Sequence, residues 1–102
     1  MQLPKFNETF IPILEILKDG QTLKSRDMIK NVEKKFYSHL PQELLDQKTK
    51  SGDRLITNRI AWGKSYLKKG GYVTFPKRGY ITITEKGLKP DFSKINLSEM
   101  QS

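Results

Sequence analysis

The sequence predicts an α+β domain in which three main helices precede a two-stranded β-hairpin. Apolar residues at helical spacing mark the helices, and two short runs of alternating residues mark the hairpin strands. The chain has 102 residues, enough for one domain whose core folds unaided. We expect this domain to span residues 1–89, and the polar, weakly patterned residues 90–102 to form a tail or linker.

The first helix is expected at about residues 7–18, with Asn7 as its N-cap. Pro12 fits if the regular helix starts near Thr9, where the early N–H groups have no intrahelical partner; a kink is the alternative. Gly20, in a left-handed conformation, is expected to end the helix. One apolar stripe should face the core, and it comprises Phe6, Phe10, Ile13, Leu14 and Leu17.

A short extended link at residues 21–23, with room for one or two strand pairs, leads to a second helix. Ser25 is expected to cap this helix, and Asp27 suits its first turn because the helix dipole favours an anion there. A helical turn is predicted at residues 41–45, before a polar loop at 46–52. The buried side chains of the second helix should be Met28, Ile29, Val32 and Phe36.

The third helix is expected at about residues 54–69. Gly63 lies on its core face, where it would allow another helix to approach closely. Trp62 and Tyr66 are expected at the boundary between helix and core, a position that favours a packing role over a base-stacking platform. The core face comprises Ile56, Ile60, Gly63 and Leu67.

The hairpin is the clearest local pattern, with strands at residues 72–75 and 80–83 and Gly79 at the strained turn position. A capped helical turn should follow at residues 84–88. The order helix, link, helix, helix, hairpin is the plan of a winged helix, in which a β-hairpin wing follows a helix-turn-helix core. A generic α+β domain would share this order.

The net charge of +8 is concentrated in residues 54–89. There, nine basic residues stand against one acid, Glu85, whereas basic and acidic residues are equal in number elsewhere. Clustered Lys and Arg suit a phosphate-lined groove through counterion release, although a solvated basic surface is the plainer interpretation. The nine are Arg54, Arg59, Lys64, Lys68, Lys69, Lys77, Arg78, Lys86 and Lys89.

The composition excludes several classes of site. The chain has no cysteine and one histidine, His39, so it lacks the residues for a disulfide framework, a thiolate or His-pair metal site, or a histidine-based triad of its own. The first residues do not resemble a signal peptide, and no apolar stretch approaches the roughly 20 residues that span a bilayer. We expect a cytoplasmic protein with no cofactor, no metal and no membrane partner.

Residues 58–72 resemble the N-terminal domain of the Mrr-type restriction endonucleases. The likeness is carried by Asn58-Arg59, Trp62, Tyr66-Leu67-Lys68-Lys69 and Gly70. It continues through Pro76-Lys77-Arg78-Gly79 and Ile83-Thr84-Glu85-Lys86-Gly87, and near the start through Leu3-Pro4, Asn7-Glu8, Ile13-Leu14 and Asp19-Gly20. It covers about residues 3–89 and departs from the family pattern in the loop at 38–53.

The resemblance implies a winged-helix domain that binds double-stranded DNA. In that family the domain normally precedes a nuclease domain, which cleaves modified, usually methylated, foreign DNA. The PD-(D/E)-x-K nuclease core is missing from this chain, because Pro90-Asp91 is not followed by the required acid and Lys pair. We therefore expect no catalysis by this chain, and a C-terminal nuclease domain of the same parent protein as a possible partner.

Five residues of the third helix are expected near base edges. Asn58 would pair with adenine or form a helix-start hydrogen bond, Lys64 would reach guanine, and Ala61 would touch a thymine methyl. Arg54 is equally suited to a phosphate contact or a solvated loop. The set is Arg54, Thr57, Asn58, Ala61 and Lys64.

A second set is expected on the phosphate backbone: Lys77, Arg78, Lys68, Ser25 and Arg26. Capping alone would explain Ser25, and interaction with the helix dipole would explain Lys68. Arg59, beside Trp62, is expected to form an ion pair with an acid of the first or second helix rather than contact DNA.

Two other functions fit the same pattern. One is a free-standing transcriptional regulator, which would dimerise on a palindrome, although no long apolar dimerisation helix is evident. The other is a protein-interaction winged helix whose basic surface meets an acidic partner. The sequence leaves the oligomeric state, the recognition sequence and the reading of methylated bases open.

Overall fold

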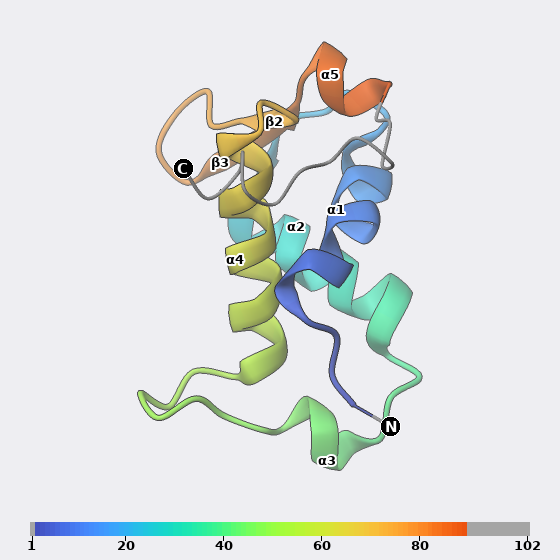
Figure 1. Ribbon diagram of the computed structural model, residues 1–102, viewed down its shortest axis with the longest axis vertical. Helices are drawn as coiled ribbons and strands as arrows, with labels where there is room; N and C mark the ends of the chain where they lie inside the picture. The colour runs from blue at the N-terminus through green and yellow to red at the C-terminus, as the bar shows by residue number, and fades with distance from the viewer. Residues whose placement is uncertain (1, 90–102) are drawn as a thin grey trace.

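The computed structural model describes residues 2–89, which form helices and one small antiparallel sheet (Figure 1). The helices are the 3-10 helix η1 (Phe6–Thr9), α1 (Phe10–Leu17), α2 (Ser25–Val32), the π-helix η2 (Glu33–Tyr37), α3 (Gln42–Leu45), α4 (Leu55–Lys69) and α5 (Glu85–Leu88). The strands are β1 (Leu23–Lys24), β2 (Val73–Thr74) and β3 (Tyr80–Ile83). The predicted α+β class is confirmed, but five α-helices and three strands replace the simpler count of three helices and two strands.

The α-helical part of the first helix starts later than the predicted residue 7. Its N-terminal turn is the 3-10 helix η1, whose N-cap is Lys5 rather than Asn7, because the Glu8 carboxylate accepts the Lys5 backbone N–H at 3.0 Å. The α-helix begins at Phe10 with Thr9 as N-cap. Pro12 therefore lies in the first turn of α1, where its missing N–H would have no intrahelical acceptor.

The sheet has the order β1-β3-β2, with β3 antiparallel to both neighbours. The register pairs Leu23 with Ile81 on one side of β3 and Val73 with Ile83 on the other. The predicted extended link before α2 is thus strand β1, which makes the sheet three-stranded. Gly79 adopts φ +82° in the turn before β3, as the sequence predicts, since side chains with a Cβ rarely adopt this conformation.

The hydrophobic core lies between α1, α2 and α4 and is closed by the sheet (Figure 1). The predicted core face of α4 is confirmed, because all four of its residues are buried. Of the second-helix stripe, Met28 and Val32 are fully buried, while Ile29 and Phe36 are only partly covered. The largest fully buried side chains are Ile13, Leu17, Met28, Val32, Ile56, Ile60, Leu67, Val73, Ile81 and Thr9.

Gly63 is the point of closest approach between α4 and η1. A Cβ at this position would overlap the Thr9 hydroxyl and lie 3.0 Å from the Phe6 carbonyl oxygen. The Thr9 side chain is fully buried and donates its hydroxyl to that same carbonyl at 2.5 Å, so it has little freedom to move. Gly63 therefore permits the close contact that the sequence predicts.

Residues 90–102, predicted as a tail or linker, lie outside the described part of the chain. Among residues 2–89, none of the helices combines the length and apolar character needed to cross a bilayer.

Substitution Gly63→Ala should lower the free energy of unfolding. Ala gains about 1 kcal/mol of helix propensity over Gly, whereas overpacking a rigid contact costs about 1–3 kcal/mol. Chemical denaturation with circular dichroism would measure the difference. The double variant with Thr9→Ala removes the overlapping hydroxyl and should recover part of the loss; a single variant more stable than the parent would contradict the contact.

Candidate nucleic-acid interface

Strand pairing joins two distant segments at one end of the molecule. The Ser25 N–H donates to the Gly79 carbonyl at 2.9 Å, directly beyond the strand pair Lys24–Tyr80. The first turn of α2, with Ser25 and exposed Arg26, therefore lies beside the loop between β2 and β3. Ser25 is the first residue of α2 and makes no side-chain capping bond, so the predicted N-cap is wrong and Lys24 takes that position.

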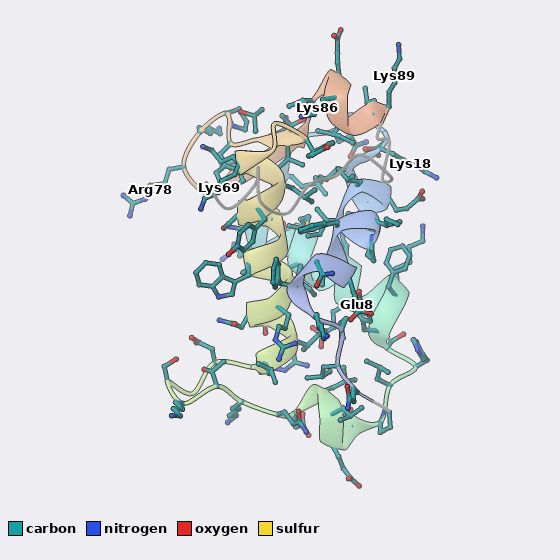
Figure 2. The ribbon with its side chains drawn as sticks, viewed as in Figure 1. Glu8, Lys18, Lys69, Arg78, Lys86 and Lys89 are labelled. Carbon is teal, nitrogen blue, oxygen red and sulfur yellow. The ribbon has the colours of Figure 1, made fainter. Side chains whose placement is uncertain are left out.

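The loop between β2 and β3 carries two exposed basic residues, Lys77 and Arg78. The Lys77 ammonium lies 4.2 Å from the centroid of the Tyr80 ring, a cation–π contact that holds it at the loop surface. Figure 2 shows Arg78 projecting away from the body of the molecule, on the same side as Lys69. The loop thus presents charge outward, as predicted for this segment.

Phe75 connects this loop to α4. The ammonium groups of Lys64 and Lys68 lie 5.1 Å and 5.5 Å from its ring centroid. Lys64 is half-buried, and this burial lowers the pKa of its ammonium group. Both lysines share one side of α4 with Thr57 and Ala61, at spacings of three and four residues.

The side of α4 opposite its core face is formed by Asn58, Trp62, Ser65 and Lys69, which we call the outward face of α4. Trp62 is 54% exposed, so its predicted packing at the core boundary is wrong. Tyr66 is partly buried and stacks on Phe6 at a centroid distance of 4.7 Å, as a packing residue should. The Asn58 amide makes no side-chain hydrogen bond within residues 2–89, so the alternative helix-start bond is not formed.

Arg54 has a structural role that neither sequence interpretation foresaw. Its guanidinium forms a two-pronged ion pair with Glu33 of η2 and also donates from Nε and Nη2 to the Leu45 carbonyl at 3.1 Å and 3.0 Å. The hydrogen bond to Glu33 raises the Arg54 pKa. Arg54 thereby ties the start of α4 to η2 and α3, and it is neither a solvated loop residue nor a free phosphate ligand.

Two further basic residues bind backbone carbonyls. Arg59 donates from Nη1 to the Pro4 carbonyl at 3.0 Å, so the predicted ion pair with an acid of α1 or α2 is wrong. Lys86 donates to the Gly70 carbonyl at 2.7 Å and satisfies the C-terminal end of α4. Of the nine basic residues in 54–89, three therefore hold the fold together.

The remaining basic side chains near the loop have no acidic partner in the described structure. Within residues 2–89 the ion pairs are Lys18–Glu15 and Arg54–Glu33. Helix α4 itself contains no Asp or Glu. The unpaired set comprises Lys64, Lys68, Lys69, Lys77 and Arg78, and residues 2–89 hold no cluster of three metal-ligating side chains beside it.

A family model described as the Mrr N-terminal domain matches residues 6–91. The chain belongs to the Mrr N-terminal domain family. The resemblance noted in the sequence is thereby confirmed over most of the chain, and family membership suggests a role in a restriction system. Comparisons with curated proteins and with solved structures found no match.

Two features of this Mrr N-terminal domain were not predicted from the sequence. The bond from Ser25 to Gly79 joins residues 54 apart, and no local pattern reports such a pairing. The exposure of Trp62 had a signal, since a wheel centred on Ile60 and Gly63 puts Trp62 near the opposite side. The spacing of four residues between Trp62 and Tyr66 instead suggests that both lie on one stripe at the core boundary.

The Arg54–Glu33 pair should be coupled. We expect Arg54→Met to cost about 1–3 kcal/mol of unfolding free energy, because it leaves the Leu45 carbonyl and the largely buried Glu33 carboxylate without a donor. A double-mutant cycle with Glu33→Gln should give an interaction energy above about 0.5 kcal/mol. The exposed pair Lys18–Glu15, treated by the same cycle, is the matched control and should give about 0–0.5 kcal/mol.

Proposed function

We propose that this Mrr N-terminal domain binds double-stranded DNA as a winged helix. Helix α4 would enter the major groove as the recognition helix, and the loop between β2 and β3 would contact the phosphate backbone as the wing. The observation that carries the proposal is the gathering of unpaired basic side chains from α4, the loop and the first turn of α2 at one end of the molecule.

The dimensions and charges suit a duplex. Helix α4 has 15 residues, about 22 Å in length, and the major groove is about 12 Å wide and admits one helix. Helix α4 also carries no Asp or Glu that would be repelled by the phosphates. Five exposed basic residues suit the phosphates on either side: Arg26, Lys68, Lys69, Lys77 and Arg78.

Base reading would depend mainly on Asn58. Its free amide can accept from and donate to adenine, and it points from the outward face of α4. Thr57 is less available, since its hydroxyl donates to the Arg54 carbonyl at 3.2 Å. Lys64 lies over Phe75 and would need to leave this contact, or to contact DNA beside the wing. Ala61 would supply a small apolar contact.

In this proposal the chain recognises DNA and a separate nuclease domain of the parent protein cuts it. The target would be modified, foreign DNA, with methylated bases as the expected mark, and the setting would be the cytoplasm. The chain itself would bind without catalysis, cofactor or metal, since its side chains at the interface are donors to phosphates and bases.

Binding should depend steeply on salt. With five phosphate contacts, the slope of log affinity against log salt concentration should be near −4.5, from about 0.9 per phosphate. Replacing Lys77 and Arg78 by Ala should reduce the slope by about 1.8 and weaken binding to all sequences alike. Fluorescence anisotropy with a labelled duplex over a range of KCl would measure both.

The matched control for that experiment replaces Lys18 and Lys89 by Ala. Figure 2 shows both residues on the opposite side of the molecule from Arg78, so the same charge is removed away from the proposed interface. The control slope should stay near −4.5. Equal effects of the two double variants would show that net charge, and not its placement, controls binding.

Asn58→Ala should reduce discrimination at one base pair by about 1–3 kcal/mol and leave non-specific affinity unchanged. Binding to a set of duplexes with single base-pair changes would locate that position. Ser65→Ala is the control on the same face, because the Ser65 hydroxyl already donates to the Ala61 carbonyl at 3.2 Å. A uniform loss of affinity for Asn58→Ala would remove this residue from the base-reading set.

A further inference from the structure

Trp62 lies at the centre of the outward face of α4, and the contacts proposed above leave it without a role. It is one of three large hydrophobic side chains in the described structure that are about half exposed. An indole that is 54% exposed forgoes part of the burial that stabilises most Trp side chains. Its position leaves the indole available to a partner outside the domain.

The indole is held from one side. Its ring centroid is 6.2 Å from that of Tyr66, and Tyr66 in turn stacks on Phe6 of η1 at 4.7 Å. This row of three rings supports Trp62 from within the domain and leaves its outer side open. A side chain supported in this way loses little conformational freedom on binding.

The surroundings of Trp62 favour an anionic partner. On the outward face, Asn58 precedes it by four residues, Ser65 follows by three and Lys69 by seven, and no acid occurs on α4. Lys69 and the neighbouring exposed Lys68 lie at the C-terminal end of α4, where a duplex would place phosphates against them and base edges against the indole. Charge complementarity therefore assigns the outer side of Trp62 to a DNA groove.

We infer that Trp62 recognises the C5-methyl group of a pyrimidine in the major groove. This inference rests on the proposed function of α4 as the recognition helix. Bases in a duplex present their edges to the groove, and the pyrimidine C5-methyl is the apolar group on those edges. A flat indole covers such a methyl, while Asn58 contacts a neighbouring base. Thymine and 5-methylcytosine both carry this group at the same place.

The test compares duplexes of one sequence that contain thymine or uracil, and cytosine or 5-methylcytosine. The parent protein should bind the methyl-bearing duplex of at least one pair about fourfold more tightly, the factor that burial of one methyl-sized group implies. Trp62→Ala should bind both members of that pair equally. The thymine pair and the cytosine pair identify which base supplies the methyl.

Ile11→Ala is the matched control, since Ile11 is 51% exposed and lies on α1 instead of α4. It should retain the preference of the parent protein, and circular dichroism should show that both variants fold. A Trp62→Ala protein that keeps the preference, or a parent protein that binds DNA without one, would overturn the inference. A parent protein that binds none of the duplexes would instead overturn the proposed function.

Fluorescence gives a second readout, because Trp62 is the single Trp of the chain. Acrylamide, a neutral quencher, should reach the indole in the free protein and be excluded in the DNA complex. Binding without protection would place the indole outside the groove and overturn the inference. Protection that instead rises with protein concentration in the absence of DNA would show a second copy of the chain on this face, with the same consequence.

Discussion

The central position of β3 in the sheet is the constraint on which the interface depends. An isolated two-stranded hairpin is marginally stable in water, and β2 pairs with β3 over only two residues. Strand β1 pairs with the other edge of β3, and the hydrogen bond from Ser25 to Gly79 continues this pairing by one residue. The loop with Lys77 and Arg78 is thereby fixed beside α2, and Phe75 fixes it beside α4.

The basic residues of this domain fall into two groups: some donate hydrogen bonds to backbone carbonyls, and others lie over aromatic rings. Arg54 and Arg59 meet partly buried carbonyls, which need donors once removed from water, and Lys86 caps the exposed C-terminal end of α4 at the Gly70 carbonyl. The ammonium groups of Lys64, Lys68 and Lys77 lie over aromatic rings instead, which leaves their N–H donors free for another acceptor. A charge of +8 therefore overstates what the surface can offer to phosphates.

The core face and the outward face of α4 have different roles. The core row requires close contact with η1 at Gly63, which sets the depth at which the helix lies in the domain. The same packing determines which residues of α4 are exposed, because the residues opposite Gly63 lie furthest from the core. Trp62 is exposed for this reason, although Trp is usually buried to a large extent.

Local sequence patterns correctly predict the bounds of β3, the span of α4 to within one residue, the core face of α4 and the left-handed turn at Gly79. These follow from local periodicity and backbone sterics, which act within a few residues. Only long-range packing, by contrast, gives Arg54 and Arg59 their partners and pairs β1 with β3. These contacts join groups 9 to 58 residues apart, and such contacts leave no periodic trace in the sequence.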